Sequence, residues 1–88
     1  MDLKLSHQKD PAEDWNISAS AKADKGEQIA RAQIVVNDST EYDESFDPPL
    51  NSWQKQLAQK GEYPGDNTVQ LTITDANGVD TEAQDSWS

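Results

Sequence analysis

The sequence predicts an all-β fold, namely a small antiparallel Greek-key β-sandwich of about seven short strands. Apolar residues recur at every second position in several short runs, which is typical of strands with one buried face. Gly, Pro, Asn and Asp separate these runs at regular spacing and indicate turns. Because 88 residues suit one domain, we expect a single unit over residues 1–88, with residues 1–14 partly flexible.

The first half of the chain is expected to hold three strands, over residues 2–6, 15–23 and 29–37. Leu3 and Leu5 share one face of the first, which is too short for more than an edge strand. In the third, Ala30, Ala32 and Ile34 share a face, and the neighbouring valines favour a strand. A helix over residues 24–33 is the alternative.

In the second half, residues 38–52 are expected to form an acidic loop, because Pro48-Pro49 forbids a helix and favours an extended or turning path. Residues 53–57 fit either a short strand or one helical turn. Residues 68–74 and 79–83 alternate around Asn77-Gly78, which predicts a tight hairpin turn with positive φ at both positions. The side chains expected in the core are Trp15, Ile17, Ile34, Val36, Trp53, Leu57, Val69, Leu71 and Ile73.

Charge is the strongest compositional feature. Seventeen acidic and seven basic residues give a net charge of −10. Five of the bases precede residue 32, whereas residues 61–88 hold six acids and no base. Such a surface repels phosphate, so direct binding to nucleic acid or to an anionic membrane is disfavoured. A basic protein partner, bound cations, solubility or adaptation to high salt remain as explanations.

No targeting or membrane segment stands out in the sequence. The N-terminus has no basic stretch followed by an apolar one, and no apolar run is long enough for a membrane helix. We expect no membrane insertion and a cytoplasmic location if the chain is complete, or an extracellular or cell-surface location if it is an excised domain. Without cysteine, neither a disulfide framework nor a thiolate metal site can form.

The acidic stretch is the first candidate binding site, and its residues are Asp38, Glu41, Tyr42, Asp43, Glu44, Phe46 and Asp47. Aromatic residues among like charges are typical of a recognition surface, and Tyr42 and Phe46 also suit anchors onto the core. The partner expected here is a protein with a basic surface. A solvated stretch that discourages aggregation is the alternative.

Asp75, Asn77 and Asp80 are the second candidate, a site for a cation. Oxygen ligands of this kind suit calcium, but the spacing lacks the distant bidentate glutamate of an EF-hand. The favoured interpretation is a hairpin in which Asp75 hydrogen-bonds its own turn. No other cofactor is expected.

No catalytic motif is found, so we expect a protein without enzymatic activity. His7 is the only histidine and is expected at the surface, and no Gly-x-Ser-x-Gly elbow accompanies it. Glycoside hydrolysis by paired carboxylates needs a cleft that a domain of this size rarely encloses. The three tryptophans could stack on sugars, but their place in alternating runs indicates the core.

The segment Ile-Val-Val-Asn-Asp (34–38) is followed by Trp53 and by Asn-Thr-Val-Gln-Leu-Thr-Ile-Thr-Asp-Ala-Asn-Gly (67–78). Through these residues the chain resembles bacterial immunoglobulin-like modules over residues 28–85. It departs at Asp38, where these modules have glycine, and in the acidity of residues 38–52. The resemblance implies an immunoglobulin-like sandwich and a non-catalytic role, as a spacer or as a module that binds protein or carbohydrate. It transfers no active site.

The alternative function is an acidic inhibitor that mimics DNA and occupies the basic cleft of a nucleic-acid-binding enzyme. Small size, high negative charge and an acid-rich stretch suit this class. Residues 41–45 and 75–78 are also similar to short stretches of phage uracil-DNA glycosylase inhibitors, at a different spacing. Carboxylates aligned in a stripe would favour the mimic, and scattered carboxylates would favour the binding module.

Overall fold

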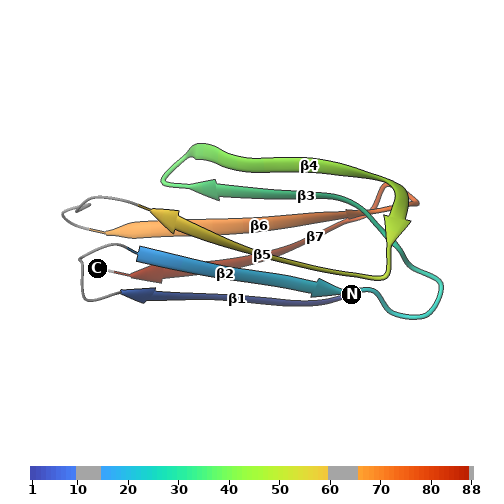
Figure 1. The fold of residues 1–88 in the computed structure, drawn as a ribbon, viewed down its shortest axis with the longest axis horizontal. Coiled ribbons are helices and arrows are strands. Elements are labelled where there is room, and N and C mark those ends of the chain that lie inside the picture. Colours follow the sequence, from blue (N-terminus) through green and yellow to red (C-terminus); the bar gives the residue numbers. More distant parts are fainter. Residues whose placement is uncertain (10–14, 60–65, 88) are drawn as a thin grey trace.

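In the computed structural model, which describes residues 1–9, 15–59 and 66–87, antiparallel strands form two facing sheets (Figure 1). The strands are β1 (Asp2–Lys9), β2 (Trp15–Lys22), β3 (Ile29–Val36), β4 (Ser39–Leu50), β5 (Ser52–Gln59), β6 (Asn67–Asp75) and β7 (Asp80–Trp87). The described residues contain no helix, so the all-β prediction is confirmed and the helix considered for residues 24–33 is wrong. It follows that none of them forms a helix suited to crossing a membrane.

The chain moves repeatedly between the two layers. One sheet has the order β1-β2-β5 and the other the order β4-β3-β6-β7, with every neighbouring pair antiparallel. The chain therefore changes sheet between β2 and β3, between β4 and β5, and between β5 and β6. Strands that are distant in the sequence consequently become neighbours.

The core lies between the sheets and is built from alternating residues. Ile34 on β3 and Leu71 on β6 pair across the larger sheet, and both are fully buried. Burial of such a side chain contributes roughly 1.5–3 kcal/mol. The buried apolar side chains are Ile17, Ala19, Ala21, Ile29, Ala32, Ile34, Val36, Trp53, Val69, Leu71, Ile73 and Trp87. Of the predicted core, Leu57 is only half-buried, and the side chain of Trp15 lies outside the described residues.

The burial pattern of β3 changes phase near its start. The prediction placed Ala30 on the core face, but Ile29 and Ala32 are buried and Ala30 is only half-buried. The ladders of β3 with β4 and with β6 both shift register between Ile29 and Arg31. Such a bulge returns the side chains to the opposite face, and this explains the buried Ile29.

Residues 39–50 form strand β4, so the loop predicted for residues 38–52 is wrong. β4 pairs with β3 and lies at the border of its sheet. Pro48 and Pro49 are tolerated because an edge strand has a side on which no partner needs the backbone N–H. The acidic stretch is therefore an ordered strand.

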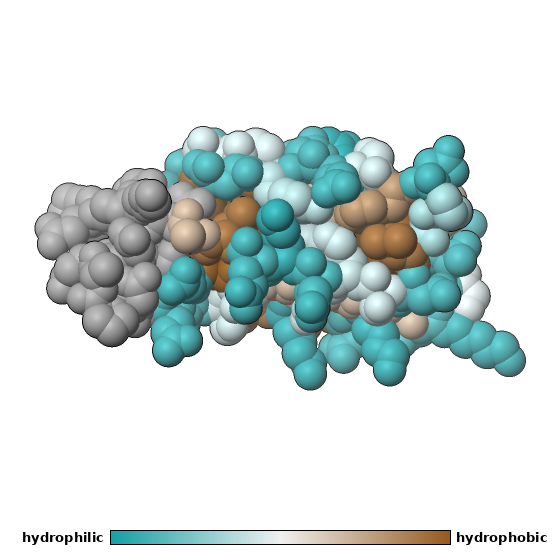
Figure 2. Space-filling view, viewed as in Figure 1, coloured by the Kyte–Doolittle hydropathy of each residue, from teal (hydrophilic) through white to brown (hydrophobic). Residues whose placement is uncertain are grey.

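The sheets have unequal numbers of strands, which leaves β4 partly uncovered. β1 lies against β7 on one side, whereas β4 extends beyond β5 on the other (Figure 1). In the same view, the space-filling picture shows apolar surface in the band between β4 and the strands below it (Figure 2). We call this side the open flank. It consists of Tyr42, Glu44 and Phe46 on β4 together with the outer edge of β5.

Candidate functional site

The charges on the strands are divided between the two sheets. Strands β1, β2 and β5 hold one acid and four bases: Asp2, Lys4, Lys9, Lys22 and Lys55. Strands β3, β4, β6 and β7 hold one base and eight acids: Arg31, Glu41, Asp43, Glu44, Asp47, Asp75, Asp80, Glu82 and Asp85. Among the described strands, the acidity is therefore concentrated on the four-stranded sheet.

The structure places the predicted partner site on one hairpin. Asp38 lies in the turn between β3 and β4, and the other six residues lie on β4 itself. The five carboxylates are exposed, whereas Tyr42 and Phe46 are half-buried. The strand thus presents carboxylates around two aromatic side chains that pack against the core.

Arg31 on β3 binds the carboxylate of Asp43. Its Nε and Nη2 donate to Oδ1 and Oδ2 at 2.8 and 2.6 Å. The hydrogen bonds from Arg31 hold the pKa of Asp43 below its usual 3.8, and they raise the pKa of the guanidinium. The carboxylates of Asp38, Glu41 and Asp47 are exposed and, in contrast, form no side-chain hydrogen bond with the described residues, so they are accessible to a partner.

Tyr42 joins β4 to β5. Its hydroxyl donates to Glu44 Oε2 at 2.6 Å and accepts from Trp53 Nε1 at 3.4 Å. The Tyr42 ring lies 5.8 Å from the Trp53 ring, and Lys55 Nζ lies 5.2 Å from the Tyr42 centroid. Burial, followed by the hydrogen bond to Glu44, raises the pKa of Tyr42 above its usual 10.0. The phenol therefore stays neutral at physiological pH and orients Glu44.

The second candidate, Asp75 with Asn77 and Asp80, is organised as a turn. Asp75 is 5% exposed, and its Oδ1 accepts the backbone N–H groups of Asn77 at 2.8 Å and Val79 at 2.9 Å. Asp80 Oδ1 instead accepts from Thr74 Oγ1 at 2.6 Å. In the described ranges, no three acidic, histidine or cysteine side chains are grouped as metal ligands. Asp75 therefore hydrogen-bonds its own turn, as the favoured interpretation expected.

The geometry of this turn differs from the prediction. Gly78 has a φ of 83°, but Asn77 does not have a positive φ. The Gly78 N–H donates to the Asp75 carbonyl at 3.0 Å, which gives a three-residue loop rather than a two-residue one. Two successive positive φ angles occur instead at Asn37 (49°) and Asp38 (66°). The tight two-residue turn is thus formed by Asn37 and Asp38, between β3 and β4, although Asp stands where an Asn-Gly turn has glycine.

His7 belongs to a contact between the sheets that the sequence analysis missed. Its Nδ1 lies 2.5 Å from Asp85 Oδ2, and its ring stacks on Trp87 with centroids 5.0 Å apart. The side chain is half-buried, with 28% exposed, and it belongs to the ordered strand β1. The alternation of Leu3 and Leu5 continues to His7, and this period is the signal that could have placed it on the inner face.

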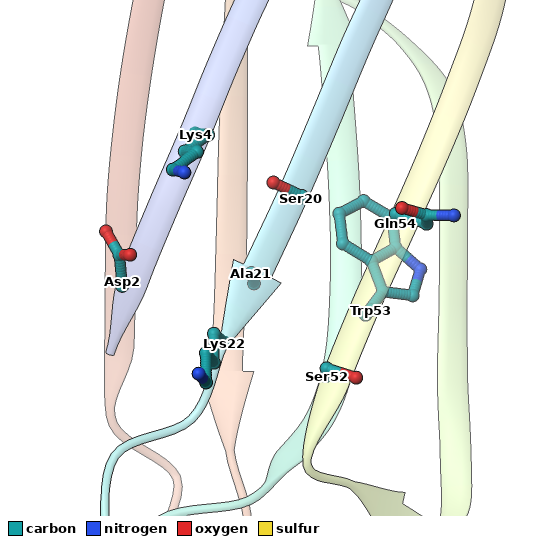
Figure 3. Close-up of a pocket in the computed structure, with 8 residues that line it drawn as sticks. All are labelled: Asp2, Lys4, Ser20, Ala21, Lys22, Ser52, Trp53 and Gln54. Carbon is teal, nitrogen blue, oxygen red and sulfur yellow. The ribbon is translucent and has the colours of Figure 1, made fainter.

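The outer face of the smaller sheet carries two adjoining shallow depressions of about 490 and 600 Å³. Figure 3 shows Lys4, Ser20 and Gln54 side by side on β1, β2 and β5, and the ring of Trp53 on β5. The lining holds a single carboxylate, that of Asp2. It offers hydroxyl, amide and ammonium groups, but no pair of carboxylates for acid-base chemistry. None of the predicted site residues lines these depressions.

Comparison with known proteins identifies no family for this chain. No protein-family model matches it, and a search of curated proteins finds no matching sequence. The chain's own residues are therefore the basis of the function proposed below.

Proposed function

We propose that this protein is a non-catalytic, immunoglobulin-like binding module that contacts a basic protein surface through β4. The observation that carries this proposal is the exposure of Glu41, Asp43, Glu44 and Asp47 around half-buried aromatic side chains on one ordered strand. Aromatic groups beside a polar rim are typical of protein interfaces. A net charge of −10 adds long-range attraction toward a basic partner.

The order of the strands supports the immunoglobulin-like part of the proposal. Immunoglobulin-like sandwiches place strands A, B and E in one sheet and can extend the opposite sheet of C, F and G with C′. The orders β1-β2-β5 and β4-β3-β6-β7 correspond to A-B-E and C′-C-F-G. The correspondence is one of connectivity alone, because the chain has no cysteine pair and Trp53 lies on β5 rather than on the third strand.

A double substitution, Glu41→Gln with Asp47→Asn, tests the role of β4. Both side chains are exposed and lack hydrogen bonds within the described chain, so we expect the fold to be retained. Wild type and variant are immobilised, exposed to cell lysate and eluted with a rising salt gradient. We expect basic proteins to elute from the variant at lower salt. Asp80→Asn with Glu82→Gln is the matched control, because it removes the same charge from β7. Equal elution from wild type and the β4 variant would contradict the proposal.

An acidic inhibitor that mimics DNA is the second candidate, favoured by carboxylates at both borders of one sheet. Asp43 on β4 lies opposite Gln33, and Glu82 on β7 lies in the same row of the ladder. Asp80 and Glu82 are two residues apart on β7, which places their Cα atoms roughly 6.6 Å apart. Two short rows of carboxylates would then face a basic cleft.

Competition with DNA separates the two candidates. For a mimic, duplex DNA should displace a nucleic-acid-binding enzyme from the immobilised protein, and both the β4 and the β7 variants should bind more weakly. For a binding module, DNA should displace nothing and only the β4 variant should lose affinity. Retention of full binding in the β7 variant would therefore eliminate the mimic.

A further inference from the structure

The open flank is where the smaller sheet lacks a strand. Tyr42 and Glu44 pair with Ile34 and Ala32, which are fully buried, so their side chains lie on the inner face of the larger sheet. Tyr42 is nevertheless half-buried and Glu44 exposed, and Phe46 is also half-buried. Within residues 1–9, 15–59 and 66–87, the smaller sheet ends at β5 and no fourth strand covers β4, so these inner positions stay accessible.

The outer edge of β5 is a row of backbone groups with no strand beside it. In the described part of the chain, β5 pairs only with β2, along its whole length of Ser52–Gln59. An edge of this kind is a template for the addition of another strand. The neighbouring edge of β4 carries acids and two prolines, which discourage pairing, whereas β5 has neither.

We propose that an extended, basic segment of a partner protein pairs with β5 as the fourth strand of the smaller sheet. The inference rests on the proposed function, since it takes the occupant to be a basic protein. Because side chains alternate along a strand, one face of the added segment covers Tyr42 and Phe46. An apolar residue suits the position over each ring, and a lysine or arginine suits the position opposite Glu44.

Charge favours a basic segment over a second copy of this chain. Glu44 lies within the open flank, Glu41 and Asp47 adjoin it on β4, and two copies of net charge −10 repel each other. Lys55 points into the flank, where its Nζ lies over the Tyr42 ring at 5.2 Å. Such a charge on an edge strand can also deter pairing. If Lys55→Met formed dimers through β5 while wild type stayed monomeric, the charge of Lys55 would serve to prevent strand pairing at this edge, and the proposal would be overturned.

The test uses a synthetic heptapeptide, Lys-Val-Thr-Lys-Thr-Val-Lys, in which two valines flank a lysine on one face, and two versions of it N-methylated at the odd or at the even positions. A strand added to β5 uses the backbone groups of only one of its own edges. We therefore expect one methylated peptide to lose more than tenfold in affinity and the other to bind like the parent. Amide hydrogen exchange should slow on β5 and not on β4.

Side-chain substitutions locate the same site independently. Tyr42→Ser with Phe46→Ser should weaken binding of the parent peptide by about tenfold, the discrimination expected when apolar contacts are lost at an interface. Val79→Ser is the matched control, because Val79 is an apolar side chain that is 58% exposed and lies on the β6–β7 hairpin, outside the open flank. The control should bind the parent peptide with the affinity of wild type. If it lost as much affinity as Tyr42→Ser with Phe46→Ser, the result would count against the proposal.

The outcomes distinguish this inference from the proposed function. Equal binding of both methylated peptides, slowed exchange on β4 alone or no binding of the parent peptide would overturn the strand addition. Loss of lysate binding in the β4 charge variant would still support the basic-partner function. If amide exchange on β5 slows and the β4 charge variant binds the parent peptide as tightly as wild type does, the result would support strand addition and contradict a basic partner. Slowed exchange on β5 at high protein concentration without peptide would assign the edge to a second copy and overturn the choice of occupant.

Discussion

Asp75 and Val79 are joined twice across the β6–β7 hairpin. Asp75 Oδ1 accepts the Val79 N–H at 2.9 Å, and the Asp75 N–H donates to the Val79 carbonyl at 2.9 Å. We predict that Asp75→Ala lowers the free energy of unfolding by about 1–3 kcal/mol, because it leaves two backbone N–H groups without their acceptor. Urea unfolding of the two proteins measures this difference. A loss near zero would mean that water replaces the carboxylate.

The same arrangement predicts that calcium has no effect on stability. Asp75 Oδ1 is occupied by two backbone N–H groups, and Asp80 Oδ1 is bound by Thr74. We expect the thermal unfolding midpoint to be the same with millimolar calcium and with a chelator. A calcium-dependent rise that Asp80→Asn abolishes would restore the cation site.

Both turns should be more stable with glycine at the position that has a positive φ. Gly78 has a φ of 83° and open space where a Cβ would lie, so Gly78→Ala is opposed by its backbone conformation alone. We expect it to cost about 1–2 kcal/mol. Asp38 has a φ of 66°, and Asp38→Gly should leave the free energy of unfolding unchanged or raise it, since glycine is favoured in such a turn. Chemical unfolding of both variants measures these changes in the free energy of unfolding. A loss for Asp38→Gly that exceeds the loss for Gly78→Ala would refute the turn assignment.

Arg31 and Asp43 should make stability depend on acidity. Because hydrogen bonding to Arg31 lowers the pKa of Asp43 from 3.8, the folded state favours the carboxylate. The stabilisation is present above that value and is lost as the pH falls through the lowered pKa. In Arg31→Gln, the fall in stability as the pH drops below about 4 should be smaller. Both side chains are more than a third exposed, so high salt should narrow the difference. Parallel curves would show that the pair contributes nothing.

His7 should hold Trp87 against the inner face of the sandwich. Trp87 is 7% exposed, and the two rings stack. His7→Ala should lower the free energy of unfolding by about 0.5–1.5 kcal/mol, shift the Trp87 emission to longer wavelength and speed amide exchange in β1. His7→Phe, which keeps a ring but loses the contact with Asp85, is the matched control and should retain the emission wavelength. An unchanged emission in His7→Ala would show that the ring does not shield the indole.

Local periodicity was enough to predict most of the core and the strands. Val69, Leu71 and Ile73 alternate without interruption, so their burial follows from the two-residue period of a strand. Ile29 was missed because a bulge, which depends on both neighbours of β3, shifts the phase. The acids and prolines of residues 39–50 predict a loop, but an edge strand can carry them where a central strand cannot.

The candidate site was predictable only as far as its residues are contiguous. Residues 38–47 lie together because they follow one another along a hairpin. Their contacts with Arg31, Trp53 and Lys55 come from pairing and from the facing sheet, which have no signature in the sequence. The division of charge between the two sheets could not be predicted from the sequence either. Asp47 and Lys55 are close in the chain but belong to different sheets.

Among the described strands, that division places negative charge on one sheet and positive charge on the other, which makes an electric dipole across the sandwich. Near a positively charged plane, such as an anion-exchange bead or an amine-coated sensor, the torque on this dipole turns the four-stranded sheet toward the plane. The serine- and glutamine-lined face of β1, β2 and β5 then points into the solution. An adsorbed layer would present this face uniformly and conceal β4. A partner that binds β4 would therefore bind this layer less than it binds the protein in solution.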